Sequence, residues 1–205
     1  IEDDYLDTIN AAFGKQEFIN KVQASINETD SLSAQKRLNK LRDEELAKLR
    51  EKDKLTQYDL DRANQMLEIE LKRIALEEAQ QNKSQMRLRR DASGNYSYQF
   101  VANEESQKKA QEELAATQKN LYDLDKENLK NLQNEFAESG SRIADIMNEF
   151  KALSPDEQAA QWEDYEAKLN YEFERQKELA LQIQEVQKNL AQSAFDSQKT
   201  LYETN

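Results

Sequence analysis

The fold of this chain is decided by a stretch that contains neither Gly nor Pro, residues Leu32 to Ser84: LSAQKRLNKLRDEELAKLREKDKLTQYDLDRANQMLEIELKRIALEEAQQNKS. Its apolar residues recur at two helical spacings, eleven residues for Leu38, Leu49, Leu60 and Leu71 and seven for Leu60, Leu67 and Ile74. Mixed spacings of this kind are typical of a nearly straight or locally unwound coiled coil. The stretch therefore predicts one helix, which at about 1.5 Å per residue would form a rod of roughly 80 Å.

The composition of the whole chain excludes most other fold classes. Only 37% of its 205 residues are hydrophobic whereas 34% are charged, and the mean hydropathy is −1.05. Three Gly and one Pro are too few for the turns of a sandwich, barrel or βαβ fold. Disorder is the competing interpretation of so polar a chain, but regularly spaced Leu, Ile and aromatic residues run throughout it. We expect an all-α protein, an elongated long-helix coiled coil or helical bundle with one inserted β-hairpin.

Local signals divide the chain into five segments. The expected segments are an N-terminal helix at 1–28, a long helix at 29–85, a β-hairpin insert at 86–102, a second long helix at 103–153 and a C-terminal helix at 154–205. The clearest boundary is Ser154-Pro155-Asp156-Glu157, where a hydroxyl caps the helix, Pro occupies its first position and Glu reaches back to the cap. Antiparallel helices are therefore expected to meet there. We favour three long helices bundled within one chain over helices that run beside copies of themselves.

The last two helices carry apolar seams of coiled-coil type. In helix 103–153 the seam through Leu121 and Leu124 is offset from the later one, in which Ser139 fills a missing position, so a stutter near 125–128 is expected. The aromatic group around Tyr171 and Phe173 could dock a partner, although packing of this group in a helix seam is the favoured interpretation. The candidate interaction residues of the last helix are Trp162, Tyr165, Leu179, Ile183, Val186 and Leu190.

Between the long helices the period of the sequence changes from helical to alternating. Residues 86–90 and 96–101 alternate apolar and polar side chains around a turn of Asp, Ala, Ser, Gly and Asn, which predicts a β-hairpin. Its candidate interaction residues share one face with Met86: Leu88, Tyr96, Tyr98 and Phe100. Because an isolated hairpin is marginal in water, this face should rest on the flanking helices or on another copy of the chain. We expect the insert to be an assembly or docking element rather than a flexible linker.

The sequence offers no recognisable catalytic, cofactor-binding or metal site. Without Cys or His it lacks thiolate chemistry, the usual zinc ligands and every His-based acid or base. Asp91, Ser93 and Asn95 match the start of a calcium loop, but Tyr96 replaces its Gly and Ala102 replaces its bidentate acid. We therefore expect no enzyme activity and no cofactor.

Charge and hydropathy also restrict the partners. A formal net charge of −12 opposes direct nucleic-acid binding, even though Arg residues flank the aromatic hairpin residues. The longest uncharged run, Ala92 to Asn103, is far shorter than the roughly 20 apolar residues of a membrane-spanning helix. The sequence starts at Ile1 rather than Met, so we expect a piece of a longer chain.

One stretch carries a resemblance to a protein family. Residues Met86 to Ala102, MRLRRDASGNYSYQFVA, followed by a polar helix around Leu121-Tyr122-Asp123-Leu124, resemble a pattern in tail tape measure and large virion structural proteins of tailed bacteriophages. The resemblance covers roughly a quarter of the chain. It implies a rod in several parallel copies, in or on the phage tail, that sets tail length and is assembled in the bacterial cytoplasm. No functional residue is carried over, because the family works by length and oligomerisation.

The leading functional hypothesis is therefore a non-enzymatic structural component of a phage virion, a tape-measure-like coiled-coil rod. Its expected partners are itself, as a homo-oligomer, and other virion proteins, with no membrane in this segment. The alternative hypothesis is a bacterial coiled-coil tether or adaptor that binds a protein partner through the aromatic face of the hairpin.

Overall fold

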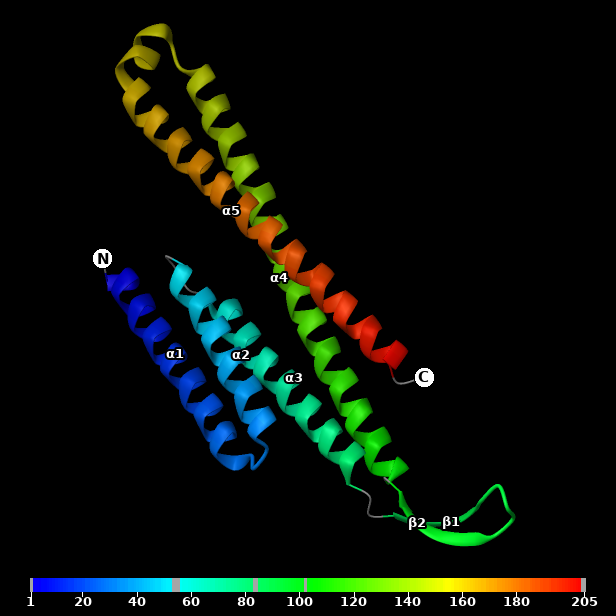
Figure 1. Ribbon diagram of the computed structural model, residues 1–205. Helices are drawn as coiled ribbons and strands as arrows, with labels where there is room; N and C mark the ends of the chain where they lie inside the picture. The colour runs from blue at the N-terminus through cyan, green and yellow to red at the C-terminus, as the bar shows by residue number, and fades with distance from the viewer. Residues whose placement is uncertain (1, 53–55, 83–84, 102, 204–205) are drawn as a thin grey trace. The chain divides into compact units, whose positions relative to one another are not determined.

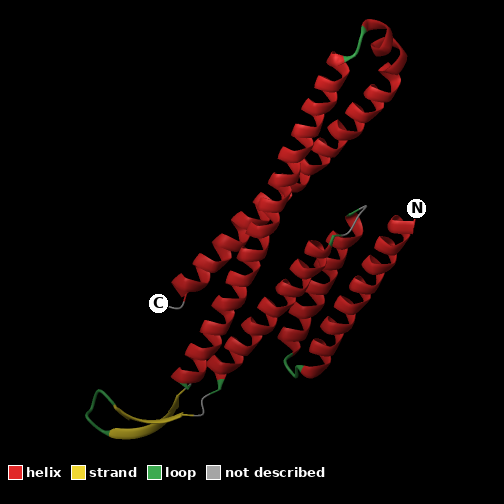
Figure 2. Cartoon of the chain, turned by 180° about the vertical axis from the view of Figure 1, so that it is seen from behind, coloured by secondary structure: helices red, strands yellow, loops and turns green. Residues whose placement is uncertain are grey.

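The computed structural model describes residues 2–52, 56–82, 85–101 and 103–203 (Figure 1). The elements in chain order are α1 (Glu2–Glu28), α2 (Leu32–Glu51), α3 (Gln57–Gln81), β1 (Gln85–Arg90), β2 (Tyr96–Val101), α4 (Glu104–Ala152) and α5 (Pro155–Glu203). The two strands form an antiparallel pair between α3 and α4 (Figure 2). This order confirms the predicted all-α class with one inserted β-hairpin.

The prediction of one long helix over 29–85 is wrong, and so is the 80 Å rod that it implied. α2 ends at Glu51, Lys52 is extended, and α3 begins after Thr56. Thr56 and Asp59 form a capping box: the Thr56 side chain accepts from the Asp59 backbone N–H, and the Asp59 carboxylate accepts from the Thr56 N–H at 2.9 Å. Lys52 also pairs with the Asp59 carboxylate. The capping box satisfies backbone N–H groups at the start of α3, which makes a new helix start at Thr56 favourable.

The chain divides into two compact units, residues 1–121 with 196–205 and residues 122–195. In the first unit α1, α2 and α3 lie side by side (Figures 1 and 2). Their shared core explains the mixed seven- and eleven-residue spacings, since the apolar residues of α2 and α3 converge on α1 rather than following one rod. The buried members of this core are Phe18, Val22, Ile26, Ala34, Leu38, Leu49, Ala63, Leu67 and Ile74.

Charged side chains bridge the helices of this first unit. The Arg37 guanidinium on α2 donates to both carboxylate oxygens of Glu77 on α3, at 2.6 and 2.8 Å, and its Nε lies 2.8 Å from Glu70. Lys72 on α3 donates to Glu113 on α4 at 2.7 Å. An Arg that engages two acids on one neighbouring helix fixes the rotation of that helix as well as its distance.

In the second unit, α4 and α5 form an antiparallel helical hairpin. α4 ends at Ala152 and α5 begins at Pro155, as predicted. The Glu157 carboxylate accepts from the Ser154 N–H at 2.9 Å and from the Ser154 hydroxyl at 2.6 Å, which is the predicted capping arrangement. Next to this turn the Phe150 ring lies 5.5 Å from the Trp162 ring and 5.2 Å from the Tyr165 ring.

The stutter predicted near 125–128 of α4 is not needed. Gln118, Asp125, Leu132 and Ser139 are all buried and lie seven residues apart, so one register passes through this region. The predicted offset arose at Leu124, which is half-buried, whereas the seam positions next to it are held by the buried polar residues Gln118 and Asp125.

Candidate interaction surface

The hairpin turn is built by residues 91–95. The Gly94 N–H donates to the Asp91 carbonyl at 3.0 Å, and the Asp91 N–H donates to the Asn95 carbonyl at 2.9 Å. Gly94 has φ +89°, a left-handed conformation that favours Gly. The Asp91 carboxylate accepts from the N–H groups of Ser93 and Asn95, each at 2.9 Å. These contacts assign Asp91 to turn formation.

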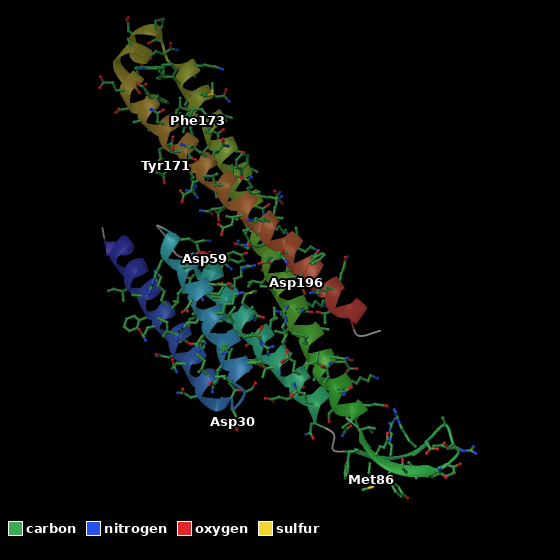
Figure 3. The ribbon with its side chains drawn as sticks, in the orientation of Figure 1. Asp30, Asp59, Met86, Tyr171, Phe173 and Asp196 are labelled. Atoms are coloured by element: carbon green, nitrogen blue, oxygen red, sulfur yellow. The ribbon has the colours of Figure 1, made fainter. Side chains whose placement is uncertain are left out.

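The strand register gathers the predicted apolar residues on one face. Met86 pairs with Phe100, Leu88 with Tyr98, and Arg90 with Tyr96, and directly opposed residues project to the same side of a sheet. We call this side the hairpin apolar face and define it by Met86, Leu88, Tyr96, Tyr98 and Phe100. Figure 3 labels Met86 on β1.

The hairpin apolar face is open to solvent. Its five side chains are between 53% exposed, for Leu88, and 72% exposed, for Tyr98. Of the two supports expected for this face, the described flanking helices do not cover it, and another copy of the chain stays a prediction. Single exposed apolar residues are ordinary on proteins, but five on a small, two-stranded sheet form a contiguous patch that needs an explanation.

The opposite face of the hairpin is polar and basic. Arg87 donates to both carboxylate oxygens of Glu104, the first residue of α4, at 2.7 and 2.9 Å. These hydrogen bonds, together with the positive charge of Arg87, lower the pKa of the Glu104 carboxyl from its ordinary value. The contact ties the base of β1 to α4. Arg89, two residue pairs nearer the tip, has no ion-pair partner within the described ranges.

Arg90 places a positive charge at the tip of the hairpin apolar face. Its Nε donates to the Gly94 carbonyl at 3.3 Å, and its guanidinium lies 5.6 Å from the centre of the Tyr96 ring. The face therefore combines aromatic and aliphatic side chains with one cation at the end near the turn. This arrangement suits burial against a surface that is apolar in the middle and acidic at one side.

The candidate residues of the last helix belong to a different structural context, in the second unit. Tyr165, Leu179 and Val186 are buried, while Ile183 and Leu190 are half-buried. They follow the alternating three- and four-residue spacing of the seam between α4 and α5. Outside the seam, Tyr171 and Phe173 are exposed on α5 (Figure 3). Trp162 is 49% exposed beside Phe150.

The sequence placed Ser139 in a seam position, but sequence reasoning missed its polar partner Glu172 and the buried pair of Asp125 and Ser193. The Glu172 carboxylate accepts from Ser139 Oγ at 2.6 Å and from Arg142 Nε at 2.8 Å. Both contacts lower the pKa of Glu172, with the hydrogen bond from Arg142 the larger cause. Further along, the Ser193 hydroxyl donates to the fully buried Asp125 carboxylate at 3.2 Å. Each of these polar residues lies seven residues from an apolar seam residue, and that spacing is the signal in the sequence that could have identified them.

The described parts of the chain hold neither a cluster of metal-binding residues nor a helix suited to span a membrane. No group of three or more acidic residues there is arranged to hold a metal ion. No helix in those ranges is both long and apolar enough to cross a membrane. The hairpin apolar face is the strongest candidate for a functional surface because its five apolar side chains are exposed together.

Comparisons of this chain with protein-family models, with curated proteins and with solved structures find no match.

Proposed function

We propose that this chain is a non-enzymatic structural component of a phage virion, of the tail tape measure type, which assembles with other proteins through its β-hairpin. The observation that carries the assembly role is the exposure of the hairpin apolar face. The virion setting comes from the resemblance of residues 86–102 and the following helix to tail proteins.

Burial of the hairpin apolar face supplies the driving force for assembly. Removing apolar surface from water contributes about 25 cal/mol per Å². A two-stranded sheet is marginally stable alone, so a partner on this face also stabilises the strands that present it. Arg87 and Glu104 hold the hairpin to the start of α4 before any partner binds, which reduces the entropy lost on docking.

The side chains of the hairpin apolar face are suited to binding rather than to catalysis. Met, Leu and Phe supply apolar area, and Tyr adds a hydroxyl at the edge of a large ring. On the hairpin apolar face, none of these side chains lies beside a carboxylate that could act as a catalytic acid or base. We therefore propose that the chain acts by holding partners in position.

The helices supply spacing and support in this proposal. Their seams include polar layers such as Ser139 with Glu172 and Asp125 with Ser193. Polar seam positions fix the register of helix pairs at some cost in stability. A defined register is what a protein needs if it is to set the distance between assembled parts.

The test uses a hairpin variant in phage particles. Tyr98→Ser with Phe100→Ser should leave the helix content of the chain intact and should reduce its incorporation into particles, measured by mass spectrometry of purified virions. Electron microscopy should show missing tails or tails of altered length. The matched control is Ser97→Ala with Gln99→Ala, which changes the same strand on its other face and should leave particles normal.

The second candidate is a tether or adaptor that binds a protein partner through the same hairpin apolar face. The same variant distinguishes this candidate from the virion component. The chain would be missing from purified particles, while Tyr98→Ser with Phe100→Ser would still abolish capture of one defined partner. Normal particle incorporation and normal partner capture by this variant would contradict both candidates.

A further inference from the structure

We propose that the occupant of the hairpin apolar face is the same face of a second copy of this chain, packed face to face and antiparallel around a two-fold axis near Leu88 and Tyr98. This inference rests on the proposed assembly role of the hairpin and specifies its partner. Two facing sheets pack about 10 Å apart when both faces are apolar.

The face is chemically self-complementary. Leu88 and Tyr98 form the middle pair, with Met86 and Phe100 toward the base and Arg90 and Tyr96 toward the tip. A two-fold axis through the middle places the tip of each hairpin over the base of the other. The mixed aromatic and aliphatic pairs then interleave, as in an isologous interface where the same patch serves both partners.

Charge selects the antiparallel arrangement over the parallel one. In a parallel arrangement the Arg90 side chains of the two copies would lie together at the same end, which is unfavourable. In the antiparallel arrangement each Arg90 approaches the base of the other hairpin, where Glu105 in the first turn of α4 is exposed, while Glu104 is already bound to Arg87. Because Arg87 neutralises Glu104, Glu105 is the acid at the base that can face Arg90, so reversing one copy brings these opposite charges together.

The remaining Arg residues restrict the pairing to one face. Arg87 and Arg89 project from the side opposite to Leu88, because adjacent strand residues alternate. Stacking through that side would bring cations of two copies together and would bury the Arg87 to Glu104 ion pair. The pairing is therefore closed at two copies instead of growing into a stack.

The available area sets the strength of the contact. With side chains of about 200 Å² each, five residues at these exposures present on the order of 600 Å² per copy. A standard stable interface buries about 800 Å² per partner. We therefore expect a weak, concentration-dependent dimer for the chain alone, which strengthens when many copies are held close together.

Single-cysteine crosslinking tests this arrangement cleanly, since the chain contains no Cys. Leu88→Cys lies near the proposed axis, whereas Ser97→Cys lies in the neighbouring strand on the opposite face. With a short bismaleimide, Leu88→Cys should form covalent dimers several-fold faster than Ser97→Cys. Equal rates for the two variants would overturn the proposal.

Charge reversal tests the antiparallel direction in the Leu88→Cys background. Arg90→Glu and Glu105→Arg should each slow dimer formation several-fold, and a mixture of the two variants should restore it as heterodimers. No effect of Arg90→Glu, or no restoration in the mixture, would overturn the proposed geometry. The Arg87 to Glu104 ion pair is unchanged in both variants.

Sedimentation of the wild-type chain separates this inference from the proposed function. A monomer at every concentration would overturn self-pairing. If Tyr98→Ser with Phe100→Ser still reduced incorporation into particles, the proposed function would stand with a different protein on the face. Loss of dimers in that variant with normal particles would keep self-pairing and contradict the function.

Discussion

Ser139 of α4 donates its hydroxyl to the Glu172 carboxylate of α5 at 2.6 Å, inside the seam where coiled coils usually place apolar side chains. Ser139 is fully buried, and the same carboxylate also accepts from Arg142 at 2.8 Å. A short side chain at Ser139 leaves the space that Glu172 fills. The second unit is therefore held at this layer by a specific polar contact.

Removing the Ser139 hydroxyl should destabilise the α4–α5 hairpin. We expect Ser139→Ala to lower the free energy of unfolding by about 1–2 kcal/mol, because a hydrogen bond to a buried charged group is lost. The matched control is Ser141→Ala, an exposed Ser whose hydroxyl donates only to the Ala137 carbonyl. Urea denaturation followed by circular dichroism measures both; equal effects would show that the Ser139 contact contributes nothing specific.

Acid should weaken the same layer. Hydrogen bonds from Arg142 and Ser139 lower the pKa of Glu172 in the folded chain. A carboxyl whose folded pKa is lower than its unfolded pKa stabilises the fold fully above the unfolded value, near pH 4.5, and loses that contribution as the pH falls through the folded value. Glu172→Gln should therefore show a shallower loss of melting temperature than wild type below pH 4.5. Parallel acid profiles would contradict this assignment.

The heptad register of α5 is tested by two Asp substitutions close together on one helix. Ile183 is half-buried in the seam, whereas Leu181 is 62% exposed. Ile183→Asp should lower the melting temperature by several degrees, because its carboxylate loses water without gaining a partner. Leu181→Asp should change it little. The reverse order in thermal melts would mean that the seam lies on another face.

The two helical glycines should respond differently to Ala. At Gly140 an added Cβ would lie 3.3 Å from the flexible Gln176 amide, whereas at Gly14 it would overlap the Leu60 side chain. Gly140→Ala should raise stability by up to about 1 kcal/mol through helix propensity. Gly14→Ala should raise the stability less than Gly140→Ala does, or should lower it, because α1 and α3 approach closely at Gly14. Thermal melting of both variants checks the order.

Local features were predictable from neighbouring residues. The alternation of 86–101 gave the strands, the turn and the shared face of Leu88, Tyr98 and Phe100, all of which the structure confirms. Ser154 and Glu157 likewise marked the start of α5. A second capping signal, Thr56 with Asp59, was present in the sequence but was overlooked inside a helical pattern.

The sequence by itself determined α1, α4, α5, the β-hairpin and the cap at Ser154, because hydrogen bonds between residues near one another in the chain set these features. Only the tertiary structure decided that α2 and α3 pack side by side, that Asp125 is buried, and that the hairpin apolar face is exposed. Burial depends on which distant segment covers a side chain, and Ser139 meets Glu172 across 33 positions of sequence. Local sequence patterns therefore do not predict which distant residues will meet.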